Sequence, residues 1–183
     1  MVSRLTDQKG LDLLLEALPA FVDRGGQLAL LGSGDPKLEA AFAKAAADHP
    51  LVAVRIGYDE NLSHRMMAGG DAVLVPSRFE PCGLTQLYGL RYGAIPVVAY
   101  TGGLVDTVIN ATPVALRSGI ATGLQFNPIG SDALAATLTK LVDLFQDAPR
   151  WAQMQRNAMR QSVDWGASAR EYVDLFDRLV AAD

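Results

Sequence analysis

The sequence predicts an α/β fold, in which a six-stranded parallel sheet carries helices on both faces. Three observations favour this class. Short apolar runs recur along the first two thirds of the chain, and turn residues follow them. Segments with apolar residues at helical spacing separate these runs. Half of the 183 residues are hydrophobic, so a substantial core is available for a sheet that helices cover on both faces.

Six apolar runs are assigned to strands. Strands typically have about 5–6 residues. The first run resembles the end of a strand rather than a whole one, so we expect the chain to be cut from something longer. The six runs cover residues 1–4, 27–31, 51–56, 72–75, 95–99 and 123–126.

Helical spacing fills the segments between the strands. In the first of them, Leu11 and Leu14 lie on one face, and Pro19 is expected to kink the helix. Asp35 and Pro36 are typical of a helix N-cap and of the first helical position. The helices expected between strands cover residues 11–22, 36–45, 62–67, 84–92 and 104–109.

The pattern changes after residue 131, where three helices follow one another without a strand. Ser131 is expected to cap the first, Pro149 to begin the second, and Trp165 to lie near the start of the third. At least one of them should pack outside the sheet, or against something absent from this chain. If the apolar face of the last helix is left uncovered, we expect the chain to self-associate.

Composition and charge argue against several classes of function. Sixteen basic and twenty acidic residues give a net charge of −4 without a basic run, which disfavours nucleic acid or an anionic membrane as a partner. No apolar stretch approaches the ~20 residues that span a bilayer, and no signal peptide is visible. The single cysteine, Cys82, excludes an intrachain disulfide and suits a reducing cytoplasm.

Polar residues follow four of the predicted strands. Because parallel strands end at one edge of a sheet, where ligands bind, we expect these groups to line one crevice. In the central group, the free N–H groups of Gly83, Leu84 and Thr85 at a helix start favour phosphate or another anion. The four groups are Arg4 with Lys9, Gly57 with Tyr58, the stretch 80–85, and Thr101 with Gly102 and Gly103.

The charged residues of these groups have two interpretations each. Arg4 and Lys9 are either solvated surface charges or the cations that hold a diphosphate. The sequence has no Asp-x-Asp motif and no residues at metal-ligand spacing, so no metal is evident to neutralise a diphosphate, which favours the second interpretation. Glu80 either caps the following helix, or binds sugar hydroxyls and balances positive charge on a reacting carbon.

The remaining candidates carry weaker signals. A nucleophilic Cys82 would need a histidine, and His64 falls inside a helix pattern, so Cys82 is expected to lend its backbone N–H instead. Tyr58 either stacks on a base or is a buried edge aromatic. The Thr-Gly-Gly stretch at 101–103 would let the backbone approach a ligand closely. The lone G-x-G at 32–34 is expected to be a plain turn.

Three strings of the sequence are similar to motifs of one enzyme family. They are VSRLTDQKG at 2–10, PSRFEPCGL at 76–84 and TGGL at 101–104. Their order and spacing agree across nearly the whole chain, and the second string is much longer than a chance motif. The chain therefore resembles bacterial glycogen synthases and plant starch synthases, and looks like the C-terminal, nucleotide-sugar-binding lobe of such an enzyme.

The resemblance implies a fold and a reaction. The family has two Rossmann-like lobes, the GT-B arrangement, with the active site between them. Residues 1–183 would form one lobe, whose helical part, about 131–183, packs toward the missing N-terminal lobe. The family moves glucose from ADP-glucose to the non-reducing end of an α-1,4-glucan, with retention and without a metal or cofactor. A cytoplasmic enzyme of glycogen biosynthesis is implied, inactive as an isolated lobe.

The resemblance also implies roles by position. Arg4 and Lys9 would hold the diphosphate and stabilise departing ADP, Glu80 would bind the glucose hydroxyls, and Tyr58 would lie near the adenine. Related transferases often carry a second glutamate eight residues after the first. That position is Tyr88 here, so no carboxylate is assigned to the ribose. The donor site would be completed by the backbone of Cys82, Gly83, Leu84 and Thr85, and by Thr101, Gly102 and Gly103.

Two alternatives stay open. One is a related two-lobed enzyme, such as a sugar-nucleotide epimerase or a phosphorylase, although no motif for the pyridoxal phosphate lysine of a phosphorylase is visible. The other is a non-catalytic module that binds a nucleotide or a partner.

Overall fold

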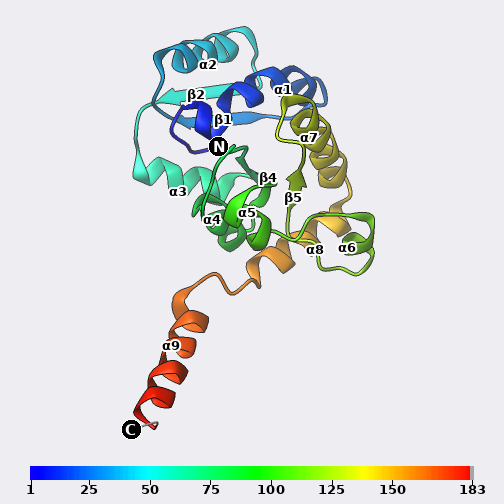
Figure 1. Ribbon diagram of the computed structural model, residues 1–183. Coiled ribbons are helices and arrows are strands. Elements are labelled where there is room, and N and C mark those ends of the chain that lie inside the picture. Colours follow the sequence, from blue (N-terminus) through cyan, green and yellow to red (C-terminus); the bar gives the residue numbers. More distant parts are fainter. Residues whose placement is uncertain (182–183) are drawn as a thin grey trace.

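The computed structural model describes residues 1–181, which form a parallel α/β lobe with an extended C-terminal helix (Figure 1). The strands are β1 (Leu28–Gly32), β2 (Val52–Ile56), β3 (Ala72–Val75), β4 (Ile95–Ala99) and β5 (Leu124–Phe126). In one sheet β1 pairs with β2, and in the other β4 lies between β3 and β5, with every pair parallel. The predicted class, parallel strands alternating with helices, is confirmed.

The single six-stranded sheet of the prediction differs from the structure at the first segment. Residues 1–5 run parallel to β1 but meet it only through isolated bridges, one of them between Val2 and Leu31. Within residues 1–181 no bridge joins this segment to β3. A hollow of about 830 Å³, bordered by Met1 and Ala72 among others, lies between the two sheets. The first segment therefore pairs on one side only, and the strands divide into two sheets.

Helices fill the connections, as the helical spacing predicts. Two short elements were not predicted, η1 (Asp7–Lys9) and α6 (Pro113–Arg117), because one turn is too short for periodicity to be recognised. The remaining helices are α1 (Leu11–Asp23), α2 (Pro36–Asp48), α3 (Glu60–Gly69), α4 (Thr85–Tyr92), α5 (Gly102–Thr107), α7 (Ser131–Gln146), α8 (Ala148–Met159) and α9 (Trp165–Val180).

Of the two predicted helix caps, the structure confirms Asp35 and corrects Ser131. The Asp35 side chain accepts a hydrogen bond from the Lys37 N–H at 2.7 Å, so Asp35 caps α2 as predicted. The helix α1 continues through Pro19. Ser131 is the first residue of α7 rather than its cap, because the preceding Gly130 has the extended backbone of an N-cap.

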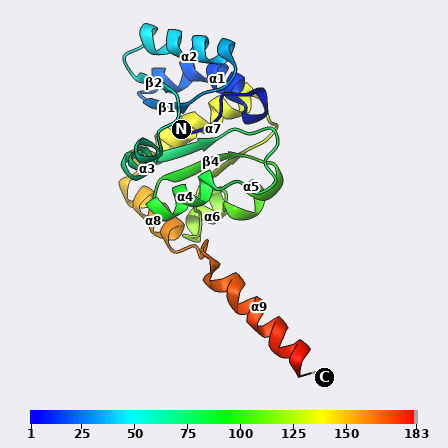
Figure 2. The ribbon, with the colours of Figure 1, turned by 90° about the vertical axis from the view of Figure 1, so that its left-hand side faces the viewer.

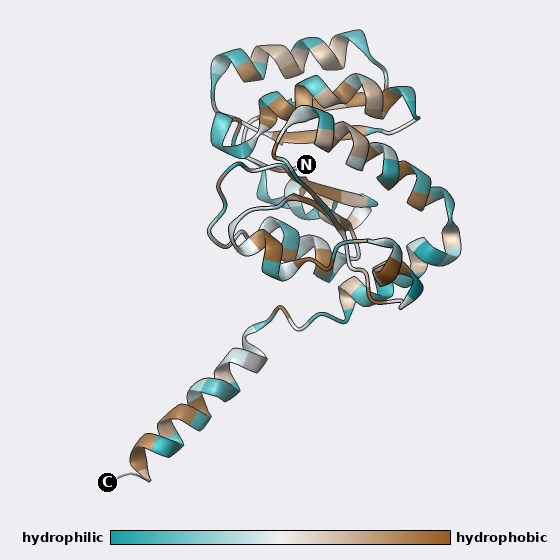
Figure 3. Cartoon of the chain, turned by 45° about the vertical axis from the view of Figure 1, so that its right-hand side comes forward, coloured by the Kyte–Doolittle hydropathy of each residue, from teal (hydrophilic) through white to brown (hydrophobic). Residues whose placement is uncertain are grey.

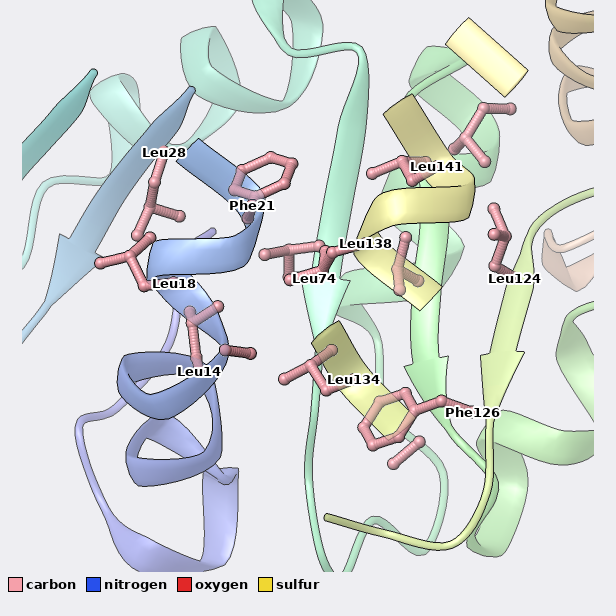
Figure 4. Packing of buried hydrophobic residues seen from close by; sticks show 14 of the residues in the cluster. Leu14, Leu18, Phe21, Leu28, Leu74, Leu124, Phe126, Leu134, Leu138 and Leu141 are labelled. Carbon is pink, nitrogen blue, oxygen red and sulfur yellow. The ribbon is translucent and has the colours of Figure 1, made fainter. Parts of the chain in front are cut away.

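The helix α7 packs against α1 on one side and against β5 on the other, and so connects α1 to the sheet of β3, β4 and β5. Leu14 and Phe21 of α1, Leu138 of α7 and Leu74 of β3 belong to one buried cluster (Figure 4). Each buried leucine or phenylalanine stabilises a fold by about 1.5–3 kcal/mol. This packing fixes the two sheets relative to one another, and with them the strand ends that carry the candidate site.

The three helices expected after residue 131 are present, and one of them, α9, lies outside the sheets as expected (Figure 1). The helices α7 and α8 contact each other and the sheets, whereas α9 extends away from the lobe (Figures 1 and 2). Hydrophobic residues recur along α9 (Figure 3). No helix of residues 1–181 is long and apolar enough to cross a membrane. The exposed large apolar side chains of α9 are Trp165, Tyr172, Val173, Leu175, Phe176, Leu179 and Val180.

Candidate functional site

The short turn η1 is docked on the loop that follows β3. The Arg78 N–H donates to the Gln8 carbonyl at 2.9 Å, and the Gln8 side-chain amide donates to the Phe79 carbonyl at 3.3 Å. Gly10 has a φ of +66°, and a Cβ there would stand 2.0 Å from the carbonyl oxygen of Pro76. Only glycine fits where η1 ends, and its small size lets the turn lie directly against the loop.

The Arg78 side chain ties the same loop to α1. Its guanidinium donates two hydrogen bonds of 2.6 Å to the Asp12 carboxylate and one of 2.7 Å to the Asp7 carbonyl. The bonds from Arg78 hold the pKa of Asp12 below its ordinary value, because they favour the charged carboxylate. A bidentate pair also restricts the relative orientation of its two side chains. The loop is therefore held from two sides.

This docking brings Lys9 and Glu80 together as an ion pair. Lys9 Nζ donates to Glu80 Oε2, and only 19% and 12% of the two side chains are exposed. The buried hydroxyl of Ser77 donates to the same oxygen at 3.1 Å. In the part of the chain that the structure describes, no hydrogen bond uses Glu80 Oε1. This second oxygen can therefore accept a hydrogen bond from a ligand.

The loop after Glu80 presents backbone donors at the start of α4. The N–H groups of Gly83, Leu84 and Thr85 donate to no acceptor among residues 1–181. Free N–H groups at a helix start, together with the helix dipole, favour an anion. The predicted anion-binding groups are thus available, next to the Lys9–Glu80 pair.

A pocket of about 300 Å³ opens beyond the ends of β1 and β2 and reaches α4. Arg4, Gly57, Tyr58 and Thr85 all line it, together with Ser33. Residues from three of the four predicted groups therefore line this pocket. Arg4 represents the first group, Gly57 and Tyr58 form the second, and Thr85 represents the stretch 80–85. Pockets of this size are at the lower end of the range for small-molecule sites.

Tyr58 stands at the rim of this pocket, with 86% of its surface exposed. The interpretation of Tyr58 as a buried edge aromatic is therefore wrong, and the ring is available for stacking. Its hydroxyl donates to the Glu60 carboxylate, which raises the pKa of Tyr58 above its ordinary value and lowers the pKa of Glu60.

Gly102 and Gly103 pack closely against the backbone of the loop that carries Glu80. The Gly103 N–H donates to the Glu80 carbonyl at 3.2 Å. At Gly102, where φ is +46°, a Cβ would stand 2.1 Å from the same carbonyl oxygen. At Gly103 it would stand 2.8 Å from the Pro81 carbonyl oxygen. Glycine is needed at positions 102 and 103 because the backbone of Glu80 and Pro81 lies so close to them. A direct contact of residues 101–103 with a ligand stays a prediction.

Cys82 and His64 do not form a nucleophile–base pair. Cys82 is exposed, and its thiol contacts the Gly83 carbonyl at 3.7 Å. The two ring nitrogens of His64 lie 3.0 Å from the Tyr92 hydroxyl and 3.2 Å from a Glu60 carboxylate oxygen. Across residues 1–181 no group of three histidine, cysteine or acidic residues is arranged to hold a metal ion.

Three residues that build the site were not among the sequence-predicted candidates. Ser77 and Arg78 lie in the PSRFEPCGL string beside Glu80, and this proximity was the available signal. Asp12 could not have been found from local pattern, because its partner Arg78 lies 66 positions away.

Known proteins place the chain in one family. Residues 1–143 match the family described as Glycosyl transferases group 1. A glycogen synthase of Paracoccus denitrificans is 64% identical over 181 residues, covering 99% of this chain and 39% of that protein. A glycogen synthase of a Jannaschia species is 61% identical over 176 residues, covering 96% of this chain and 37% of that protein.

The catalytic domain of starch synthase IV from Arabidopsis thaliana, solved with ADP and acarbose, has the same fold. The TM-score is 0.84 at 33% identity, covering 98% of this chain and 38% of that chain. The fold is thus that of a lobe of a GT-B glycosyltransferase, and the chain spans less than two fifths of the length of these relatives. The family match covers 143 of the 183 residues, and the chain belongs to the glycosyl transferases of group 1.

Proposed function

We propose that this chain is the donor-binding lobe of a glycogen synthase. The reaction moves glucose from ADP-glucose to the non-reducing end of an α-1,4-glucan, with retention at the anomeric carbon. The observation that carries the proposal is the Lys9–Glu80 ion pair, held beside the N–H groups of Gly83 and Leu84, which donate to no acceptor among residues 1–181. The substrates are supported by the relatives, which are named glycogen synthases, and by the starch synthase solved with ADP and acarbose.

The charges of the site suit the bond that this reaction breaks. Cleavage of the sugar–phosphate bond leaves negative charge on ADP and positive charge on the anomeric carbon. Arg4, Lys9 and the start of α4 supply positive potential for the ADP. The Glu80 carboxylate supplies negative potential on the sugar side. Groups that are already oriented toward developing charge lower the barrier, because they need no reorganisation during the reaction.

The two carboxylate oxygens of Glu80 have different partners in this proposal. Oε2 is held by Lys9 and Ser77, which leaves Oε1 to accept hydrogen bonds from the glucose hydroxyls. Lys9 fixes the carboxylate and at the same time remains a cation close to the departing diphosphate. The exposed ring of Tyr58 and the pocket that it shares with Arg4 and Thr85 would receive the adenine and ribose.

The proposal is tested by titrating ADP into this chain and into Arg4→Ala and Lys9→Ala variants by calorimetry. Loss of a charged contact to the diphosphate should weaken binding at least about tenfold, or roughly 1.4 kcal/mol. Lys44→Ala is the matched control, because Lys44 forms an exposed ion pair with Asp48 on the surface of α2. Equal ADP affinity in Arg4→Ala, Lys9→Ala and Lys44→Ala would refute the diphosphate assignment.

Transfer itself requires more than donor binding. Since the chain spans less than two fifths of its relatives, we propose that the N-terminal lobe of the same enzyme supplies the rest of the active site. The isolated chain should bind ADP-glucose without elongating glucan, and adding the missing lobe should restore synthesis. If donor is bound but synthesis is not restored, a non-catalytic nucleotide-binding module becomes the better interpretation.

The same proposal includes a cytoplasmic enzyme that needs no metal and no cofactor. The support is chemical, because Arg4, Lys9 and backbone N–H groups can together neutralise a diphosphate. ADP affinity should therefore be the same with added Mg²⁺ and with a chelator. A chelator that weakens ADP binding would contradict this part of the proposal.

A further inference from the structure

Gln86 is fully buried beneath the loop that follows Glu80. It is the second residue of α4, and its side chain turns back under the loop. The side-chain nitrogen Nε2 donates to the Cys82 carbonyl at 2.9 Å and to the Gly83 carbonyl at 3.0 Å. Because glutamine is seldom completely buried, its role at this position lies in the hydrogen bonds that it makes.

These two bonds set the direction of two peptide groups. In a planar trans peptide the N–H points away from the C=O of the same group. The Cys82 carbonyl shares its peptide with the Gly83 N–H, and the Gly83 carbonyl shares its peptide with the Leu84 N–H. Since both carbonyls are drawn inward to Gln86, both N–H groups are turned outward, where no acceptor of residues 1–181 takes them.

Gln86 also connects this loop to α5. Its Nε2 lies 3.3 Å from the Thr107 hydroxyl oxygen, and that hydroxyl donates to the Gly103 carbonyl at 2.9 Å. The Gly103 N–H donates in turn to the Glu80 carbonyl at 3.2 Å. The hydrogen bonds therefore run from the loop through Gln86 to α5 and back, so the loop and α5 are held as one unit.

The oxygen of the Gln86 side-chain amide has no hydrogen-bond partner within residues 1–181. Among the buried side-chain nitrogens and oxygens of the described residues, Gln86 Oε1 alone lacks a hydrogen bond. It packs against Gly83, where a Cβ would stand 2.6 Å from it. A buried acceptor without a donor destabilises the folded state. Glutamine at position 86 thus lowers the stability of the folded state through Oε1, and we attribute its presence to the orientation that Nε2 gives to the loop.

We propose that Gln86 is a positioning residue, which holds the N–H groups of Gly83 and Leu84 toward the diphosphate and sugar of the donor. The identity of the donor rests on the proposed function, whereas the orientation of the loop does not. An amide nitrogen suits this role because it donates twice to adjacent carbonyls. A methionine of similar length donates nothing, and a carboxylate repels both carbonyl oxygens.

The test compares the wild-type chain with Gln86→Met and Asn157→Leu, using ADP as the probe in calorimetry. Asn157 is a matched control, because its side-chain nitrogen also donates to two backbone carbonyls, those of Gly119 and Ala121, which belong to neither α5 nor the Glu80 loop. We expect Gln86→Met to bind ADP at least tenfold more weakly than wild type, and Asn157→Leu to remain within twofold. Thermal melts of both variants report any general loss of stability.

Three outcomes decide the matter. Wild-type affinity in Gln86→Met overturns the inference, as does an equal loss of affinity in Asn157→Leu. If the wild-type chain itself binds no ADP, the proposed function fails, and a crystal structure of Gln86→Met tests the inference alone. Unchanged directions of the Cys82 and Gly83 carbonyls in that structure overturn it, and outward-turned carbonyls support it.

A second variant covers the case in which Gln86→Met does not fold. Gln86→Glu keeps the shape of the side chain, and burial raises the pKa of the introduced carboxyl. The protonated acid donates one hydrogen bond, whereas the carboxylate donates none. Relative to wild type at each pH, ADP affinity should be at least tenfold lower at pH 8 and should recover as the pH falls. A ratio that does not change with pH overturns the inference.

Discussion

The guanidinium of Arg78 and the carboxylate of Asp12 face one another through two hydrogen bonds of 2.6 Å, although 66 positions of sequence separate them. This pair joins the start of α1 to the loop after β3. The turn η1, which directly precedes α1, carries Lys9, and the loop after β3 carries Glu80. The Arg78–Asp12 pair therefore helps to hold Lys9 and Glu80 together, although neither Arg78 nor Asp12 lines the pocket.

Replacing Arg78 by methionine should weaken donor binding through this connection. We expect ADP-glucose affinity to fall about tenfold, or 1.4 kcal/mol, because Lys9 and Glu80 lose their fixed relation. The loss in the free energy of unfolding should stay near about 1 kcal/mol, since both partners are more than a third exposed. Calorimetry and urea unfolding measure the two effects.

Arg24→Met is the matched control for Arg78→Met, because Arg24 forms an ion pair with Asp143 far from the strand ends. It should change stability by a comparable small amount and leave ADP-glucose affinity intact. An equal loss of affinity in both variants would contradict a specific role for the Arg78–Asp12 pair.

The same pair predicts a dependence of stability on pH. The bonds from Arg78 lower the pKa of Asp12 from its ordinary value of 3.8 in the folded state. The folded state therefore binds fewer protons there than the unfolded state. The contribution to stability is complete above about pH 4 and is lost as the pH falls through the lower, folded pKa.

Urea unfolding of wild type and Asp12→Asn at several pH values measures this contribution. The wild type should be more stable by up to about 1 kcal/mol between pH 5 and 7, an estimate that allows for solvent screening of a partly exposed pair. This difference should shrink below about pH 4. A difference that is constant, or that grows as the pH falls, would show that Arg78 does not lower the pKa of Asp12.

Replacing Ser77 by alanine should weaken the binding of ADP-glucose more than the binding of ADP. Its hydroxyl binds Glu80 Oε2, so Ser77→Ala leaves the carboxylate held by Lys9 alone. Loss of a hydrogen bond to a charged group amounts to about 1.5–3 kcal/mol at most, and we expect a three- to tenfold loss of ADP-glucose affinity. ADP affinity should change less than about twofold, or 0.4 kcal/mol.

Calorimetry with the two ligands separates these effects. Thr139→Val is the control, because it removes a hydroxyl that bonds the Ala135 carbonyl within α7, away from the strand ends. If Ser77→Ala weakens ADP and ADP-glucose equally, Glu80 does not face the sugar.

The alternation of strands and helices, and the sheet edge at which the candidate residues gather, could be predicted from local pattern. Apolar runs and helical spacing are properties of neighbouring residues, and parallel strands bring their following loops to one edge. That reasoning correctly joined Arg4, Tyr58 and Thr85, which line one pocket. It was also sufficient to bring Lys9 and Glu80 to the same edge.

The pairings inside the site could not be predicted, because they join residues distant in sequence. Lys9 meets Glu80 across 71 positions, and nothing local distinguishes a lysine that grips a carboxylate from one that faces solvent. Glycine is ambiguous for a related reason. A missing side chain at Gly102 permits close approach by either a ligand or another backbone, and the structure places the Glu80 carbonyl there.

Gly102 gives a sharp test of that contact. A Cβ at this position would stand 2.1 Å from the Glu80 carbonyl oxygen, and the residue has a φ of +46°. Gly119 has a φ of +67°, and no atom of the described residues 1–181 lies within 4 Å of the place that a Cβ would take, so Gly119→Ala measures the backbone strain alone. Gly119→Ala should lower the free energy of unfolding by about 1 kcal/mol, and Gly102→Ala by about 1–3 kcal/mol more. Urea unfolding of both variants measures the difference, and equal losses would refute the close packing of the two loops.

The exposed apolar face of α9 predicts self-association of the isolated chain. Tyr172, Phe176 and Leu179 share one face of this helix at spacings of three and four residues, and each is more than half exposed. Removing apolar surface from water contributes about 25 cal/mol per Å², so two such faces should pair when the lobe is concentrated. Light scattering should show an average mass above that of one chain, rising with concentration.

Two double variants with the same change in net charge decide whether this face is responsible. Phe176→Glu with Leu179→Glu places two carboxylates on the apolar face, and should restore the mass of one chain. Arg170→Gln with Arg178→Gln removes two charges from the opposite, polar face, and should associate as the wild type does. Since both pairs lower the net charge by the same amount, general repulsion cannot explain a difference between them. A wild-type chain that stays monomeric at high concentration would mean that exposure of this helix face is too small a driving force to offset the entropy lost on association.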